Sequence, residues 1–195
     1  MMDCQQAWLS PAKINLFLRI TNQRGDGMHE LQTAFQFVDL CDQLHFYNRE
    51  DGLIRRTTAI PGVPVENDLC IRAAHLLKAY AGTGQGVDIS VQKVIPMGGG
   101  LGGASSNAAT TLRVLNQLWG VGASQEDLAV MAVSLGADVP IFIHGHAAWA
   151  EGIGERLVPI NPPEKFYLIA DAGVHVSTAD MFADPQLTRN CPALT

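Results

Sequence analysis

A glycine-rich run with two serines is the part of this sequence best suited to hold a phosphate group. Residues 96–109 read Pro-Met-Gly-Gly-Gly-Leu-Gly-Gly-Ala-Ser-Ser-Asn-Ala-Ala. Glycine reaches positive φ and leaves the backbone uncovered, so consecutive peptide N–H groups can converge on an anion. Ser105 and Ser106 stand where a helix begins, where either can cap it and where free N–H groups favour a phosphate. The run therefore predicts a phosphate-binding loop.

Other interpretations of this loop fit less well. The P-loop of nucleotide hydrolases ends in Gly-Lys-Ser or Gly-Lys-Thr, and no lysine follows these glycines. Gly98, Gly100 and Gly103 match the Gly-x-Gly-x-x-Gly of dinucleotide-binding folds, but that motif needs an acid after a second strand about 20 residues later. Residues 124–127, at that distance, form a capping box that opens a helix. A flexible turn without a ligand is the remaining alternative.

Lys13 and Asp138 are candidates for charge and proton chemistry. Lys13 and Asn15 alternate in an apolar stretch, so a strand places both on one face. The alternative is an edge strand with one wet face. Asp138 follows an expected helix and precedes an expected apolar strand at 139–143, a junction where a side chain can face a cleft. The alternative for Asp138 is an ordinary turn before a proline.

Hydrophobic periodicity and turn signals predict the elements that position these residues. Strands are expected at 13–20, 31–47, 87–91, 139–143, 147–151, 157–160 and 166–171, with a turn at 23–27. Helices are expected at 105–119 and 124–135, and a third one is capped by Asp68 and ended by Gly82. Strands and helices cluster rather than alternate. The pattern therefore predicts an α+β fold, with a mixed or antiparallel sheet covered by helices on one side.

Composition excludes several classes of protein. The chain has 195 residues with 47% hydrophobic content, enough for one well-buried domain or one domain with an appendage. Its net charge of −6, with scattered Lys and Arg, argues against a nucleic-acid surface. Four separated cysteines and no signal sequence predict reduced thiols in the cytoplasm, and no apolar run reaches the ~20 residues of a membrane span. His144 and His146 fall short of a zinc ligand set, so no metal site is expected.

Residues 96–109 resemble the second motif of the GHMP kinases, the relatives of galactokinase, homoserine kinase, mevalonate kinase and phosphomevalonate kinase. Further motifs, at residues 10–18, 26–33, 136–140 and 162–165, narrow the resemblance to one branch of that family. The likeness runs from about Leu9 to at least Phe182. It implies a fold like domain 2 of ribosomal protein S5. It also implies ATP-dependent phosphorylation of the 2-hydroxyl of cytidine diphosphate-linked methylerythritol, in non-mevalonate isoprenoid synthesis.

The resemblance implies a role for individual residues. Asp138 would accept the proton of the substrate hydroxyl, and Lys13 would keep that carboxylate ionised and stabilise the developing charge. Mg²⁺ would arrive with ATP, and Ser105 or Ser106 could touch it. The residues implied in ATP binding are Leu69, Lys93, Pro96, Met97, Gly98, Gly99, Gly100, Leu101, Gly102, Gly103, Ala104, Ser105 and Ser106. Those implied in substrate binding are Asn15, Met28, His29, Phe35, Thr178 and Phe182.

Two residues depart from the pattern of the family. Met28 stands where an aromatic side chain usually stacks on cytosine, so Phe35 and Phe182 would carry more of the stacking. Asp68 stands where asparagine is usual, which puts its adenine contact in doubt.

The family is also longer than this chain. We therefore expect residues 1–165 to be the N-terminal ATP-binding domain and 166–195 to begin the connection to a C-terminal domain absent from this chain. Nucleotide binding would survive, turnover would suffer, and exposed apolar surface would favour a homodimer or other self-association. The rival interpretations are another small-molecule GHMP kinase and a nucleotide-binding fragment with little activity.

Overall fold

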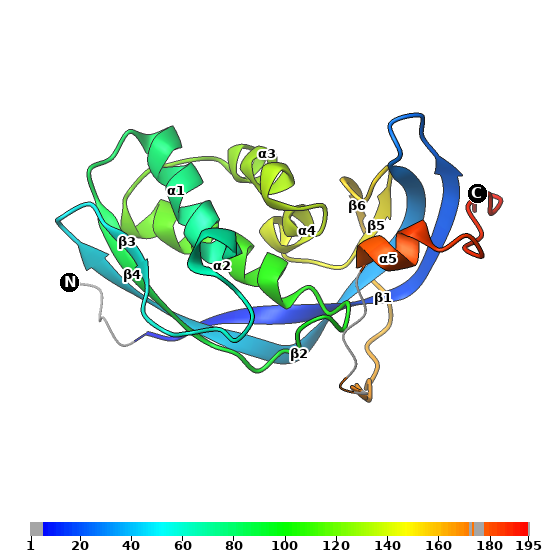
Figure 1. The fold of residues 1–195 in the computed structure, drawn as a ribbon, viewed down its shortest axis with the longest axis horizontal. Coiled ribbons are helices and arrows are strands. Elements are labelled where there is room, and N and C mark those ends of the chain that lie inside the picture. Colours follow the sequence, from blue (N-terminus) through cyan, green and yellow to red (C-terminus); the bar gives the residue numbers. More distant parts are fainter. Residues whose placement is uncertain (1–5, 172, 174–177, 195) are drawn as a thin grey trace.

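The computed structural model describes residues 6–171, 173 and 178–194, in which a mixed sheet carries helices on one face (Figure 1). The strands are β1 (Trp8–Gln23), β2 (His29–Arg49), β3 (Ile54–Arg56), β4 (Gly86–Gln92), β5 (Ala148–Glu151) and β6 (Arg156–Pro159). The helices are the short η1 (Val65–Asn67), α1 (Leu69–Ala81), α2 (Gly103–Leu118), α3 (Gln125–Leu135), α4 (Val139–His144) and α5 (Thr178–Ala183). None of the described helices is long and apolar enough to cross a membrane.

Strand β2 organises the sheet. It pairs antiparallel with β1 over most of its length, and also with β4 near its end and β5 near its start. The order β3-β4-β2-β5-β6 includes one parallel pair, β3 with β4, so the sheet is mixed. Helices α1 to α4 lie on the same side of it (Figure 1). The expected α+β architecture is therefore confirmed.

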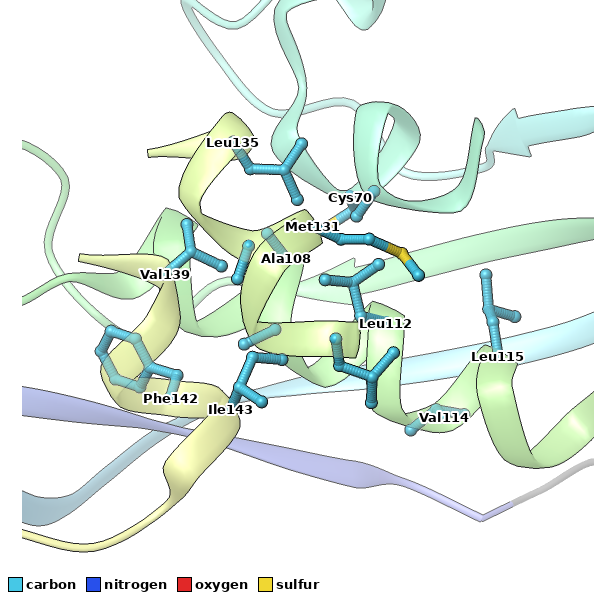
Figure 2. Close-up of a cluster of buried hydrophobic side chains, with 14 of the residues drawn as sticks. Cys70, Ala108, Leu112, Val114, Leu115, Met131, Leu135, Val139, Phe142 and Ile143 are labelled. Atoms are coloured by element: carbon cyan, nitrogen blue, oxygen red, sulfur yellow. The ribbon is translucent and has the colours of Figure 1, made fainter. Parts of the chain in front are cut away.

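The main core lies between α2 and its neighbours. Ala108, Leu112 and Leu115 of α2 are fully buried, and Figure 2 shows Leu112 pointing toward Met131 of α3 in this cluster. Apolar residues at this 3.6-residue spacing give α2 one face that must be covered. The helix is thereby fixed against the sheet, with its first turn beside the glycine-rich run.

Two helix starts follow their expected capping signals. The Asp68 side chain accepts a hydrogen bond from the Cys70 N–H (2.8 Å), and Gly82 ends α1 with φ 59°. Ser124 and Asp127 form a capping box at the start of α3. Short polar side chains at these positions satisfy N–H groups that the helix itself leaves free. The local sequence alone therefore defines both starts.

The start of α2 corrects one expectation, because neither Ser105 nor Ser106 caps it. The N-cap is Gly102, at φ 72°, and both serines lie inside the first turn. Glycine adopts this positive φ readily, so the helix begins at Gly103, before either serine. The Ser106 hydroxyl is buried and accepts a hydrogen bond from the Ser10 hydroxyl at 2.7 Å.

Two expected strands are wrong. Residues 139–143 belong to helix α4, and all five are buried. A short apolar run has no polar face to reveal its period, and Pro140, which suits a first helical turn, was the better signal. Residues 166–171 form no regular element, and Phe166 and Leu168 are fully or almost fully exposed. Among the described strands, the sheet ends at β6, which leaves this segment without a partner.

Candidate active site

Lys13 and Asp138 lie side by side, as the resemblance to the GHMP kinases implies. Lys13 Nζ, on β1, lies 3.3 Å from Oδ2 of Asp138, the residue that precedes α4. The lysine side chain is 5% exposed and the aspartate side chain 42%. The cation is thus held inside the protein, while the carboxylate remains open to a molecule that approaches from solvent.

Further contacts fix the Lys13 ammonium in place. It donates a hydrogen bond to Asn15 Oδ1 at 2.7 Å, and Asn15 Nδ2 donates to Thr33 Oγ1 at 2.7 Å. The ammonium also lies 5.0 Å from the centre of the Phe35 ring, within reach of a cation–π attraction. The Lys13 backbone N–H donates to the Leu101 carbonyl oxygen at 3.0 Å, which ties β1 to the glycine-rich loop. Lys13 therefore has little freedom to turn away from Asp138.

The loop beside Lys13 can only be built with glycine. Gly98, Gly100 and Gly102 have φ of 79°, 71° and 72°, a region that residues with a Cβ rarely adopt. A Cβ on Gly102 would also lie 2.8 Å from the Phe142 ring and 3.2 Å from Lys13 Cγ. The uncovered backbone and the start of α2 together make a surface that favours an anion.

A cleft of about 410 Å³ joins the loop to Asp138. Its other wall, formed by the segment before η1 and the start of α1, adds Ile60, Val63 and Leu69, an apolar surface suited to a flat base. Gly99 and Ser106 are outside the lining. The residues predicted to bind ATP that do line the cleft are Leu69, Lys93, Pro96, Met97, Gly98, Gly100, Leu101, Gly102, Gly103, Ala104 and Ser105.

Asp42 supports this cleft and was missed by the sequence analysis. Its carboxylate is fully buried and accepts hydrogen bonds from Lys93 Nζ, from Asn107 Nδ2 (2.9 Å) and from the N–H groups of Val94 (2.7 Å) and Ile95 (2.8 Å). It thereby connects β2 to the chain that enters the loop and to α2. An acid between apolar residues in the second half of a long strand was the signal that could have identified it.

Asp68 has a second bond besides its cap of α1. Its Oδ2 accepts from Arg56 Nη1 at 2.8 Å, and both side chains are almost completely buried. The residue lines the cleft, but its carboxylate is already engaged by the fold. Arg56 thus supplies the opposite charge for the aspartate that stands where asparagine is usual in the family.

The residues predicted to bind the substrate lie in two groups. Asn15 and Phe35 contact Lys13, and the Phe35 ring is 2% exposed. His29 and Phe182 stack with ring centres 4.9 Å apart and planes at 25°. Thr178 is the first residue of α5, close in the chain to Phe182.

Met28 precedes His29 and is 44% exposed. Its backbone N–H donates a hydrogen bond to Asp26 Oδ1 at 3.0 Å in the turn between β1 and β2. The side chain thus stands on an ordered turn beside the stacked rings.

Comparison with known proteins identifies the fold and its relatives. Residues 68–146 match the family described as "GHMP kinases N terminal domain". The 4-diphosphocytidyl-2-C-methyl-D-erythritol kinase of Nitrosococcus oceani is 55% identical over 188 residues, which are 96% of this chain and 67% of that protein.

Solved structures agree with this assignment. A crystal structure of 4-(cytidine 5'-diphospho)-2C-methyl-D-erythritol kinase superposes with a TM-score of 0.71 at 41% identity, over 81% of this chain and 56% of that one. Homoserine kinase from Cytophaga hutchinsonii has the same fold, with a TM-score of 0.68 at 17% identity, over 96% of this chain and 62% of that one. The chain thus spans about two thirds of the length of the Nitrosococcus oceani kinase and just over half of the length of the solved 4-(cytidine 5'-diphospho)-2C-methyl-D-erythritol kinase.

Proposed function

Because the chain belongs to the 4-diphosphocytidyl-2-C-methyl-D-erythritol kinases, a branch of the GHMP kinases, we propose that it binds ATP and phosphorylates the 2-hydroxyl of 4-diphosphocytidyl-2-C-methyl-D-erythritol. The observation that carries this proposal is the Lys13–Asp138 pair, whose carboxylate lines the same cleft as the glycine-rich loop. A base and an anion-binding surface side by side are what phosphoryl transfer to an alcohol requires. The place of action we propose is the cytoplasm, as expected from the sequence.

The proposed reaction uses each of these groups once. The substrate hydroxyl oxygen attacks the γ-phosphorus of ATP, the bond to the oxygen that bridges the β- and γ-phosphates breaks, and ADP leaves. Asp138 takes the proton of the hydroxyl. Lys13 holds that carboxylate in an ion pair before the reaction and stabilises negative charge as it develops. The loop amides and the start of α2 hold the phosphates in line for the transfer.

The residues present are compatible with Mg²⁺ that arrives bound to ATP. Among the described residues no group of three or more His, Cys, Asp or Glu side chains could hold a metal ion. Ser105 and Asp138 both line the cleft and could offer a hydroxyl oxygen and a carboxylate oxygen. When bound, the ion would neutralise charge between the β- and γ-phosphates.

Two rival functions share the same cleft. Another small-molecule GHMP kinase would use the same loop and base with a different alcohol. A nucleotide-binding fragment would bind ATP but transfer no phosphate. The chain spans only part of the length of its relatives, which supports this alternative. We also propose that residues 166–195 begin the connection to the remaining part of such a kinase.

One experiment separates these possibilities. The chain is incubated with MgATP and 4-diphosphocytidyl-2-C-methyl-D-erythritol, and ADP and the phosphorylated product are both measured, beside homoserine and mevalonate as alternative acceptors. Asp138→Asn should abolish product while ATP still binds, whereas Asp39→Asn, at an exposed acid of β2 outside the cleft lining, should leave turnover unchanged. ATP binding without any product would favour the fragment. Product from another acceptor would favour a different kinase.

A further inference from the structure

One arginine joins the last described segment of the chain to the start of β2. Arg189 Nε donates a hydrogen bond to His29 Nε2 at 3.1 Å. Its two Nη atoms donate to the carbonyl oxygens of Phe182 (2.7 Å), Asp184 (2.8 Å) and Leu187 (3.0 Å). The guanidinium therefore holds the turn after α5 in one shape and engages a ring of β2 at the same time.

His29 is held in two independent ways. The stack on Phe182 fixes the plane of the imidazole ring. The bond from Arg189 fixes the rotation within that plane, because it selects the Nε2 edge. The opposite edge, which carries Nδ1, therefore points away from the guanidinium, and no hydrogen bond from the described residues engages Nδ1.

The chemistry of the donor decides which ring nitrogen carries the proton. A guanidinium has only N–H groups and cannot accept a hydrogen bond. Nε2 of His29 must therefore be the acceptor, and the neutral ring must carry its proton on Nδ1. The result is an N–H donor in a fixed direction.

We propose that Arg189 is a positioning residue that holds His29 in the Nδ1–H tautomer, so that His29 donates a hydrogen bond to the cytosine ring of the substrate. This inference rests on the proposed function, which supplies the cytidine group. Cytosine offers an acceptor at N3, whereas uracil carries a proton at the same position. A fixed donor at His29 thus favours cytidine over uridine, and a ring free to change tautomer loses that preference.

Two measurements on the same 195-residue chain test the proposal. The tautomer of His29 is read from long-range ¹⁵N–¹H correlation spectra at a pH of about 8, where imidazole is in general neutral. Binding of cytidine 5'-diphosphate and of uridine 5'-diphosphate is measured by calorimetry. The variants are Arg189→Met, which removes every N–H donor of the side chain, and Arg189→Lys, which keeps a single donor nitrogen.

Arg19→Gln is the matched control. Arg19 Nη1 donates to the Pro192 carbonyl oxygen at 2.9 Å, so it tethers the same C-terminal segment without touching His29. A loss that merely reflects a loosened segment would appear in this variant as well.

In the wild-type chain we expect the Nδ1–H tautomer. In Arg189→Met we expect mixed tautomers, about tenfold weaker cytidine diphosphate binding (about 1.4 kcal/mol) and little change for uridine diphosphate. Arg189→Lys should recover part of both effects, and Arg19→Gln should show neither.

The proposal is overturned by a wild-type ring protonated on Nε2, by an unchanged tautomer in Arg189→Met, or by equal losses in Arg19→Gln. Failure of the wild-type chain to bind cytidine diphosphate, with the expected tautomers, overturns the cytidine assignment of the proposed function and the recognition role of His29 with it. The two failures are distinguishable because the spectra need no ligand.

Discussion

At the scale of single residues, the chemistry of the cleft depends on a lysine that the protein has buried. Lys13 lies beside an amide oxygen, a carboxylate and the face of an aromatic ring, each of which attracts a cation. A charge fixed in advance needs no rearrangement when the reaction begins. Asn15 and Phe35 therefore serve mainly to hold the Lys13 ammonium in place.

Lys13→Met should therefore remove most of the phosphoryl transfer without unfolding the chain. We expect kcat to fall by about 10² to 10³, the cost typical of one lost electrostatic donor, while the KM for ATP changes little. Steady-state kinetics measure both quantities. Lys165→Met, at an exposed lysine, is the control, and equal losses in the two variants would contradict the assignment.

Gly102 occupies a position where any side chain is costly. An alanine there is strained by φ 72° and brings its Cβ to 2.8 Å from the Phe142 ring. Gly122 has φ 73° with open space around it, so Gly122→Ala carries the strain alone. We expect Gly122→Ala, the control, to lower the free energy of unfolding by about 1 to 2 kcal/mol. Gly102→Ala should lower it by about a further 1 to 3 kcal/mol because of overpacking. Urea unfolding measures both values. Equal costs would mean that the ring moves aside freely.

At the scale of elements, Asp42 connects β2, the entry to the loop and α2. Removal of this carboxylate leaves buried donors without a partner, so Asp42→Ala should cost about 3 to 5 kcal/mol of unfolding free energy. Asp39→Ala, at an exposed acid on the same strand, should stay within about 0.5 kcal/mol. Urea unfolding checks both values. A small effect at Asp42 would show that water replaces its bonds.

The capping box of α3 gives an element-scale prediction for pH. The Ser124 hydroxyl and backbone N–H lower the pKa of Asp127, so its stabilising contribution is present above the ordinary pKa of about 3.9 and is lost as pH falls through the lower folded value. Ser124→Ala should cost about 1 kcal/mol at neutral pH. The gap in Tm between variant and wild type should narrow toward pH 3, in thermal scans at stepped pH. A gap that stays constant would show that Asp127 does not act through Ser124.

The elements also show how far the sequence could be interpreted. Strands β1, β2 and β4 and helices α1 and α3 were predictable because period, caps and turns agree there. Helix α4 was not, since its apolar run is buried on all sides and carries no periodic signal. In the site, the pairing of Lys13 with Asp138 was implied by the resemblance, and the structure places the two side chains 3.3 Å apart. Asp42 and Arg189 were not, because their partners lie far away in the chain.

At the scale of the whole molecule, the segment after β6 exposes large apolar side chains. Phe166 and Leu168 have almost no contact with the rest of the described structure, and Leu16 and Leu18 of β1 are also exposed. Such side chains promote association between copies of a chain. We expect sedimentation to reveal concentration-dependent self-association, and the double variant Phe166→Ser, Leu168→Ser to reduce it. Val130→Ser, at an exposed valine of α3, is the control. A wild-type chain that stays monomeric would contradict this expectation.

The wide separation of Lys13 and Asp138 along the sequence has a consequence for how the protein is made. Synthesis on the ribosome runs from the N-terminus, so β1 and the glycine-rich loop emerge before the residue that accepts the proton. A chain interrupted between α2 and α4 carries the anion-binding loop but lacks Asp138. Products of interrupted translation therefore lack the proposed base, and phosphoryl transfer would begin only after α3 and α4 have been synthesised and packed.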